Sequence, residues 1–251
     1  MCPFGAGNKQ MTYIQGFRIE REKLPASSLP IYAKSLSESQ DIYKNCLWLK
    51  KTFRYGSVNH SIEIVDSDRS VRLNNVFRKL AMPIYIEAIN NFKFEVYQPL
   101  VRFRPLCAED LKKEHFQRFL DDLALIHATG VAHGDIKWVN VGITEDSKVH
   151  LFDWEPFLIL RTQNRYQIRS TIYAIAPSDR KAKLVTPKSD WYAIASLYVR
   201  LVYGLQKMLQ IAHSTSHSVR LEAMIISNYA DGITKFIDNI DTQLEKVLVF
   251  N

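Results

Sequence analysis

The stretch VAHGDIKWVNVGI, which runs from Val131 to Ile143, places a histidine, a glycine, an aspartate, a lysine and an asparagine within eight positions between apolar neighbours. One interpretation is structural, because Gly134, Asp135 and Asn140 are residues that commonly form turns between core elements. The other is chemical, because the same side chains can position a ligand or move a proton. The sequence on either side of the stretch decides between the two.

A second aspartate, Asp153, follows at the end of an apolar segment in HLFDWEPF. Phosphoryl transfer from a magnesium-bound nucleotide needs a carboxylate that orients the attacking hydroxyl, a cation beside the transferred phosphate and hard oxygen ligands for the metal. Asp135 and Lys137 supply the first two groups, and Asn140 with Asp153 supplies the third. The combination favours phosphoryl transfer over a turn-forming role alone.

The motifs between residues 131 and 205 resemble those of the protein kinase family. HGDIKWVN resembles the catalytic loop that the family writes H-R-D-x-K-x-x-N, and FDWE resembles its D-F-G metal motif. STIYAIAPSDRKAKLVTPKSDWYAIASLYVRLVYG resembles the segment that closes the activation loop and enters the buried central helix of the large lobe. Asp190 stands where the family keeps a buried aspartate that supports the catalytic-loop backbone. Lys137 is the family's mark of Ser/Thr rather than Tyr specificity.

The pattern of the remaining segments predicts the fold class. Aromatic and β-branched residues in MTYIQGFRIE, LPIYAKSL, NCLWLKKTF and FKFEVYQPL predict strands, and RSVRLNNVFRKLAM between the last two has a helical rhythm. EHFQRFLDDLALIHATG and SDWYAIASLYVRLVYGL predict helices, with Gly130 closing the first and Ser189 or Asp190 capping the second. Together with the resemblance, this predicts an α+β, two-lobed protein kinase-like fold. A small antiparallel β-rich nucleotide-binding lobe would span residues 1–98, and a mainly helical catalytic lobe would span residues 99–251.

The resemblance implies ATP and Mg²⁺ as cofactors and a protein hydroxyl as the phosphate acceptor. Asp135 is expected to orient or accept the proton of a Ser or Thr hydroxyl, and Lys137 to steady the γ-phosphate. Asn140 and Asp153 are expected to hold Mg²⁺. His133 is expected to be a packed, structural residue.

Outside these motifs, the sequence leaves alternatives for the residues that contact the nucleotide. The backbone around Leu100 and Val101 is expected to meet adenine. The phosphate-holding lysine is expected at Lys50, but strand alternation leaves Lys51 as the alternative. Gly16 is the only glycine between residues 12 and 45, so the sequence has no glycine-rich loop to cover the phosphates of the nucleotide. The segment SLSESQ, residues 35–40, is a candidate to take the place of that loop. Glu63 is the nearest candidate for the glutamate that pairs with the lysine, although an exposed Glu63 is favoured.

Three replacements depart from the family pattern. Gly134 stands in place of the arginine that gathers a phosphorylated activation-loop residue, so we expect a kinase that loop phosphorylation does not switch. Glu155 replaces a flexible glycine, which would make a flipped arrangement of Asp153 harder to reach. Ser178 replaces the glutamate of A-P-E and removes an ion-pair partner.

Two other functions stay open. A small-molecule phosphotransferase acting on a sugar or amino alcohol has the same fold and often an H-G-D loop, although Lys137 and the IYAIAP segment, which resembles a peptide-binding platform, favour a protein substrate. A pseudokinase that serves as a binding module would also lack the glycine-rich loop.

The charge and hydropathy of the sequence indicate which classes of binding partner to expect. A net charge of +7, from 33 Lys and Arg against 26 Asp and Glu, favours acidic partners, but the basic residues are spread out and predict no nucleic-acid interface. No apolar run reaches the ~18 residues of a membrane span, and the first residues lack a secretory signal pattern. We therefore expect a soluble cytoplasmic protein. The compact size resembles that of kinases of viruses and of bacterial effectors, which would place it in a host cytoplasm beside a host or activating partner.

Overall fold

The computed structural model describes residues 18–29, 46–54, 84–90, 93–154, 172–182, 185–229, 242, 244 and 245. Two compact units make up the chain: the first comprises Met1–Asn74, Pro83–Leu100 and Leu160–Thr162, and the second Asn75–Met82, Val101–Ile159 and Gln163–Asn251. The lobe boundaries expected from the sequence, 1–98 and 99–251, stay predictions. Within the described residues, no helix is long and apolar enough to cross a membrane.

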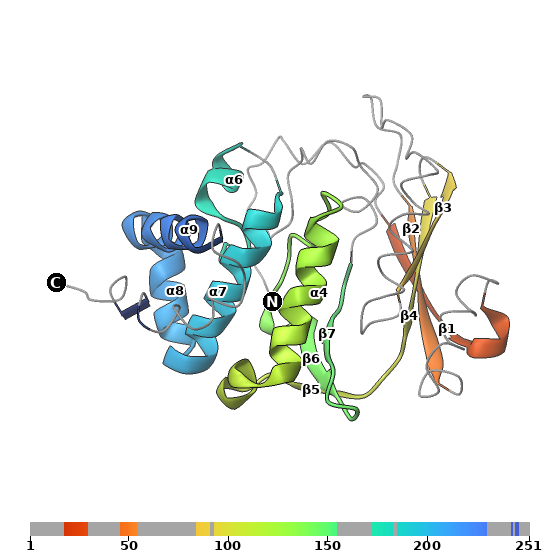
Figure 1. Cartoon of the computed structure of the whole chain (residues 1–251). Helices are drawn as coiled ribbons and strands as arrows, with labels where there is room; N and C mark the ends of the chain where they lie inside the picture. Colours follow the sequence, from red (N-terminus) through yellow and green to blue (C-terminus); the bar gives the residue numbers. More distant parts are fainter. Residues whose placement is uncertain are drawn as a thin grey trace. The chain divides into compact units, whose positions relative to one another are not determined.

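The first unit contains a four-stranded antiparallel sheet in the order β1-β2-β4-β3 (Figure 1). Its strands are β1 (Arg18–Pro25), β2 (Leu47–Arg54), β3 (Tyr85–Asn90) and β4 (Lys93–Pro99), and the short 3-10 helix η2 (Ala26–Ser28) follows β1. The strands predicted in NCLWLKKTF and FKFEVYQPL are confirmed as β2 and β4, and the end of MTYIQGFRIE lies in β1. Residues 30–45 and 55–83, which hold most of LPIYAKSL and all of RSVRLNNVFRKLAM, lie outside the described residues.

The strand β3 is not among the predicted strands. Ile84, just before the strand, and Tyr85 and Ile86 at its start are all buried, so the segment lacks the alternation that marks a half-buried strand. The register between β2 and β4 places Lys51 opposite Val96 and Lys50 opposite Tyr97. Because successive residues of a strand face opposite sides, the two lysines lie on different faces of the sheet.

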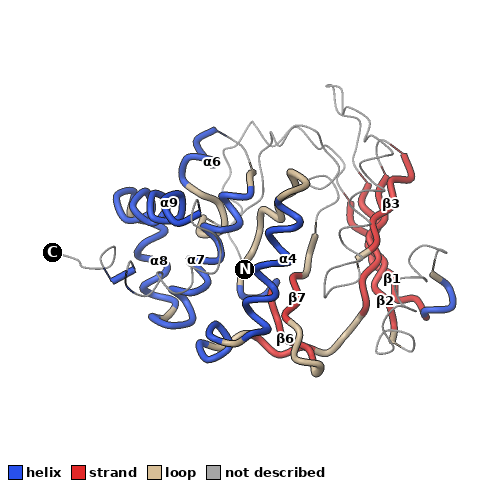
Figure 2. The backbone as a smooth tube through the Cα atoms, viewed as in Figure 1, coloured by secondary structure: helices blue, strands red, loops and turns tan. Residues whose placement is uncertain are grey.

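The second unit combines a small sheet with helices (Figure 2). The sheet has the order β5-β6-β7 and is antiparallel. Helices α7, α8 and α9 pack against one another, and α4 packs against β7. The elements, in chain order, are β5 (Phe103–Pro105), η3 (Ala108–Lys112), α4 (Glu114–His127), η4 (Trp138–Asn140), β6 (Val141–Thr144), β7 (Val149–Leu151), α6 (Pro177–Ala182), α7 (Pro187–Tyr203), α8 (Leu205–His213) and α9 (Thr215–Tyr229).

Helix α4 has the amphipathic pattern that the sequence predicts. The apolar side chains at helical spacing are all buried, namely Phe116, Phe119, Leu120, Leu123 and Ile126. The helix ends at His127, earlier than expected. Gly130 closes the following turn with a φ of +77°, a conformation that favours glycine, and its N–H donates to the His127 carbonyl at 2.9 Å.

Helix α7 is buried along residues 189–199, as its nearly continuous apolar sequence predicts. Its expected start is wrong: the helix begins at Pro187, and Thr186 precedes it in an extended conformation. A proline suits the first helical turn, because N–H groups there have no acceptor within the helix and the missing N–H of proline costs no hydrogen bond. Ser189 and Asp190 therefore lie within the first turn, and their side chains serve other contacts.

Candidate active site

The loop between α4 and β6 carries the first group of predicted site residues. Lys137 Nζ lies 2.5 Å from Asp135 Oδ2, and Asn140 Nδ2 donates to the Asp135 carbonyl at 2.9 Å. Asn140 is buried, whereas the side chains of Asp135 and Lys137 are partly exposed. The structure thus brings a carboxylate, a cation and an amide together, with the carboxylate and the cation accessible to a ligand.

A buried carboxylate from α7 holds this loop in place. Asp190 has no exposed surface, and its two oxygens accept hydrogen bonds from the backbone N–H of His133 at 2.6 Å and of Gly134 at 2.8 Å. His127 Nε2, at the end of α4, lies 2.9 Å from Asp190 Oδ2. The supporting role that the resemblance implies for Asp190 agrees with these bonds, which fix the backbone immediately before Asp135.

Gly134 occupies a position that favours glycine. Its φ is +75°, in the left-handed region where a side chain of an L-residue approaches its own backbone. An arginine here would strain the backbone by about 1 kcal/mol or more. The replacement of the family's arginine therefore has a local conformational reason.

His133 links the loop to the segment that contains Asp153. The ring is buried; Nε2 lies 2.8 Å from the Phe152 carbonyl, and Nδ1 accepts the Asp135 N–H at 3.2 Å. These partners require one neutral tautomer, with the proton on Nε2. Desolvation by burial lowers the pKa of His133, which favours the same neutral form. The bonds agree with the structural role expected for this histidine.

Asp153 lies just beyond β7 and is exposed. Its φ is +65°, which aspartate tolerates better than most residues. The N–H of the preceding Phe152 donates to the Asn140 carbonyl at 2.7 Å. This backbone hydrogen bond holds the segment that carries Asp153 next to Asn140. In Asn140, Nδ2 is bonded to Asp135, which leaves Oδ1 as the atom able to bind a cation.

This donor set fits Mg²⁺. A carboxylate oxygen and an amide oxygen are hard ligands, and Mg²⁺ usually takes one or two protein ligands besides water and phosphate oxygens. The described residues contain no group of three or more His, Cys, Asp or Glu side chains able to hold a metal ion. A site for a transition metal built from protein ligands alone is therefore not found in this part of the chain.

An aromatic surface next to Asp153 was not predicted from the sequence. The rings of Phe103 in β5 and Phe152 lie 4.6 Å apart, and the Phe103 side chain is 46% exposed. A Cβ atom on Gly142 would come within 2.2 Å of Phe103 Cδ2, so Phe103 lies directly over this glycine. An exposed ring of this kind can stack on a planar ligand such as a nucleobase.

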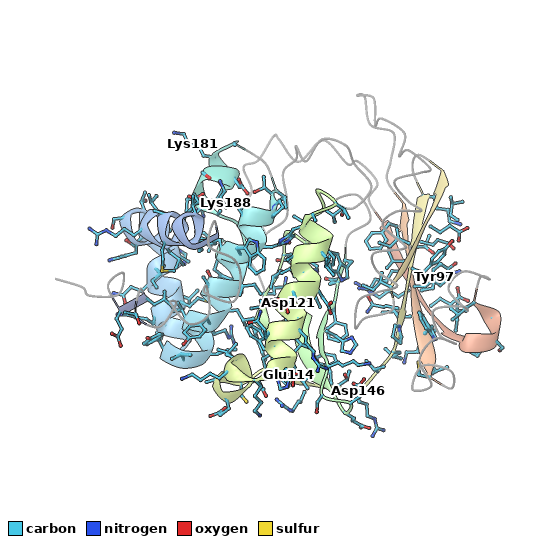
Figure 3. All side chains as sticks on the ribbon, in the orientation of Figure 1. Tyr97, Glu114, Asp121, Asp146, Lys181 and Lys188 are labelled. Carbon is cyan, nitrogen blue, oxygen red and sulfur yellow. The ribbon has the colours of Figure 1, made fainter. Side chains whose placement is uncertain are left out.

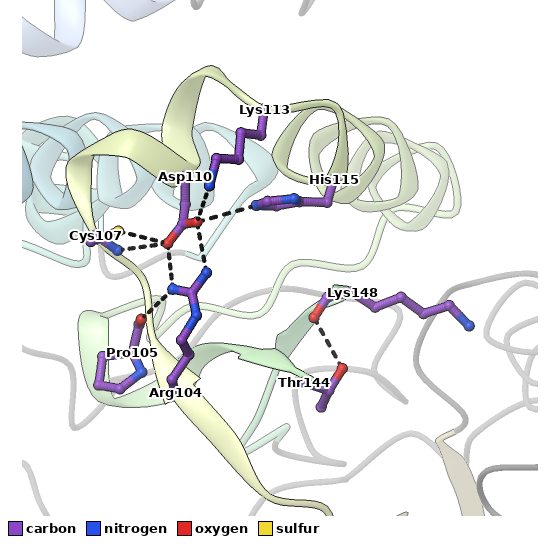
Figure 4. A network of polar contacts seen from close by, with 8 residues as sticks. All are labelled: Arg104, Pro105, Cys107, Asp110, Lys113, His115, Thr144 and Lys148. Carbon is purple, nitrogen blue, oxygen red and sulfur yellow. Dashed lines mark hydrogen bonds and ion pairs between the residues drawn. The ribbon is translucent and has the colours of Figure 1, made fainter. Parts of the chain in front are cut away.

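A polar network fixes β5 to the start of α4 (Figure 4). Arg104 donates to both oxygens of Asp110, at 2.6 and 2.9 Å, and the Cys107 N–H donates to the same carboxylate at 3.0 Å. Lys113 and His115 each lie 3.5 Å from it. Asp110 is fully buried, and the Arg104 hydrogen bonds hold the pKa of its carboxyl well below the usual range. The network stabilises the segment that carries Phe103.

The predicted nucleotide contacts in the first unit are only partly described. Lys50 Nζ forms an ion pair with Glu22 Oε2 at 2.8 Å, whereas Lys51 is buried on the opposite face. The Leu100 N–H donates to the Leu47 carbonyl at 2.7 Å, so the carbonyl is the backbone group of Leu100 left for a ligand. Glu63, Glu155 and residues 35–40 lie outside the described residues.

Comparison with known proteins places these features in a family context. Residues 30–248 match the family described as protein kinase domain. A probable serine/threonine-protein kinase of Dictyostelium discoideum is 27% identical over 156 residues, which cover 59% of this chain and 30% of that protein, so the chain spans less than a third of that relative. The Cydia pomonella granulovirus kinase PK-1 has a similar solved structure, with a TM-score of 0.44 and 12% identity over 62% of this chain and 60% of that chain.

Proposed function

Since the chain belongs to the protein kinase domain family, we propose that it transfers the γ-phosphate of Mg-ATP to Ser or Thr hydroxyls of proteins. The expected α+β, two-lobed protein kinase-like fold is confirmed by this membership. The observation that most supports the proposal is the bonded group of Asp135, Lys137 and Asn140, held by the buried Asp190. A cytoplasmic location and an activating or host partner stay predictions.

Asp135 and Lys137 would carry the chemical step. The oxygen of the acceptor hydroxyl attacks the γ-phosphorus, the bond from phosphorus to the bridging oxygen breaks, and ADP leaves. Asp135 orients the hydroxyl and accepts its proton. Lys137, 2.5 Å from Asp135, balances the charge of the transferred phosphoryl group. The partial exposure of both side chains supports their access to substrate.

Asn140 and Asp153 would hold Mg²⁺ through Oδ1 and a carboxylate oxygen. The ion neutralises charge on the nucleotide phosphates. The backbone around Leu100 and Val101 would meet adenine, and the exposed ring of Phe103 supplies an aromatic surface in the same part of the chain.

We further propose that activation-loop phosphorylation does not control this kinase. Gly134 has no side chain that could receive a phosphorylated residue, whereas the family's motif has an arginine at this position. A requirement for phosphate on Ser170, Thr171 or Tyr173 would contradict this proposal.

The direct test compares the protein with its Asp153→Ala variant after incubation with Mg²⁺ and labelled ATP, alone and with myelin basic protein. We expect label on protein Ser and Thr, and a loss of at least about 100-fold in the variant because a metal ligand is missing. Asp121→Ala, which removes an exposed carboxylate of α4 (Figure 3), is the matched control and should keep full activity.

The same assay separates the alternatives. Label that appears only on added aminoglycosides or choline would identify a small-molecule phosphotransferase. Nucleotide binding without turnover on any acceptor would identify a pseudokinase.

The two lysines of β2 form a matched pair for a second test. Under our proposal, Lys50→Met weakens ATP binding by about tenfold or more, because a charged contact to phosphate is lost. Lys51→Met should leave ATP affinity within about twofold, because the Lys51 side chain lies on the opposite face of the sheet from Lys50. Both constants can be measured by titration with a fluorescent ATP analogue. The opposite result would transfer the role to Lys51, the alternative that strand alternation leaves open, which lies on the other face of the sheet opposite Val96.

A further inference from the structure

A polar network around two buried carboxylates joins the beginning of α6 to α7 and α9. Ser178 lies in α6 and replaces the glutamate of the A-P-E motif. The Ser178 N–H donates to Glu222 Oε2 at 3.1 Å, and the Ser178 hydroxyl also donates to the Glu222 carboxylate. Glu222 lies within α9 and is buried, and α6 packs against α9. The carboxylate that holds this turn therefore comes from another helix.

Lys188 connects the two carboxylates of the network. Its Nζ lies 3.2 Å from Glu222 Oε1 and 3.1 Å from Asp179 Oδ1, and it also donates to the Ser178 hydroxyl. The side chain lies at the start of α7 (Figure 3). Burial opposes its charge, but the bonds to Asp179 and Glu222 outweigh this effect and raise the pKa of Lys188.

Hydroxyl groups complete the network. Asp179 is buried and accepts hydrogen bonds from Thr186 Oγ1 at 2.5 Å and Ser189 Oγ at 2.7 Å. Ser189 Oγ in turn accepts the Ala176 N–H at 3.2 Å. The backbone is thus held at Ala176 and at Ser178, on both sides of Pro177.

The segment held in this way also contacts the catalytic loop. Ala174, Ile175 and Ala176 are buried, and Ile175 belongs to one apolar cluster with Val185 and Ala132. Ala132 directly precedes His133, whose N–H is bonded to Asp190. A shift of residues 172–178 would therefore disturb packing against the loop that carries Asp135.

We propose that Glu222 and Lys188 are positioning residues that hold residues 172–178 in the conformation that receives the protein substrate. This inference rests on the proposed function, since it assigns the segment a role in binding the protein acceptor. Glu222 accepts two hydrogen bonds from Ser178 and pairs with Lys188, so removing its carboxylate takes a partner from the Ser178 N–H, the Ser178 hydroxyl and Lys188 at once. The small side chain of Ser178 fits this arrangement, because Glu222 supplies the carboxylate from α9.

The test compares Glu222→Gln and Glu222→Ala with Arg220→Gln, an exposed position on the same helix. Glu222→Gln keeps the shape of the side chain and tests the charge in a variant that should fold. Amide hydrogen exchange of residues 172–178 is measured in each, together with KM for myelin basic protein, KM for ATP, and kcat. We expect exchange and the protein KM to rise about tenfold in Glu222→Ala and less in Glu222→Gln, as for the loss of a hydrogen bond to a charged group. KM for ATP should stay within about twofold, and Arg220→Gln should match the parent protein.

The outcomes separate the two levels of the proposal. Unchanged exchange in both Glu222 variants would show that Glu222 does not hold the segment. Faster exchange with an unchanged protein KM, or with equal changes in the KM for ATP, would overturn the positioning role. If the parent protein labels no protein acceptor, the proposed function fails, and with it the substrate role, while the exchange comparison still decides whether Glu222 holds the segment.

Discussion

Replacing Asp135 with asparagine should lower kcat for transfer to protein by about 100- to 10,000-fold, the range expected when a general base is removed. Asparagine has nearly the same shape and can still contact Lys137, but it cannot accept the proton of the attacking hydroxyl. The backbone bonds of this residue, from its N–H to His133 and from Asn140 to its carbonyl, do not need the carboxylate. We therefore expect the loop to keep its conformation and ATP binding to change by less than about threefold.

The measurement is a rate of label transfer under saturating ATP, with nucleotide binding determined separately by titration. Asp146→Asn is the matched control, because Asp146 is a partly exposed carboxylate of the same unit, as Asp135 is, and is bonded to Thr144 and Lys148 in the turn between β6 and β7. A kcat within about threefold of the parent value in Asp135→Asn would show that Asp135 is not the base. If transfer to a sugar or amino alcohol fell instead, the site would be right and the acceptor wrong.

The sequence predicted those parts of the site that depend on neighbouring residues. Asp135, Lys137 and Asn140 lie within six positions, so a single loop with an η4 turn brings them together. Residues of α4 were predictable for the same reason, because the period of 3.6 places Phe116, Leu120 and Leu123 on one buried face.

Contacts between distant polar residues could not be read from the same patterns. Glu222 and Ser178 are 44 positions apart, and nothing in either local sequence indicates the other. Phe103 and Gly142 likewise meet only because β5 pairs with β6. The departure at Ser178 was visible in the sequence, but only the packing of α9 against α6 shows which group compensates for it.

Removing the carboxylate of Asp190 should have the largest effect on stability. In Asp190→Ala, two backbone N–H groups, of His133 and Gly134, and the ring of His127 lose their partner inside the protein. Loss of one partner from a buried charged network typically lowers the free energy of unfolding by about 3–5 kcal/mol. Urea unfolding followed by tryptophan fluorescence would measure the change, and Trp191, which meets the His127 ring edge to face, is one of the four tryptophans that contribute to the signal.

The variant Asp190→Asn separates the contribution of the negative charge to stability from that of the hydrogen bonds. Its carbonyl can still accept one backbone N–H, but its NH₂ group then faces the other N–H or His127, so we expect an intermediate loss of stability. Asp121→Ala on the surface of α4 should change stability by no more than about 0.5 kcal/mol. A loss below about 1 kcal/mol in Asp190→Ala would mean that water replaces the carboxylate and that the loop does not depend on it. A large loss of stability would show that the hydrogen bonds from the His133 and Gly134 N–H groups to Asp190 tie the loop before Asp135 to α7.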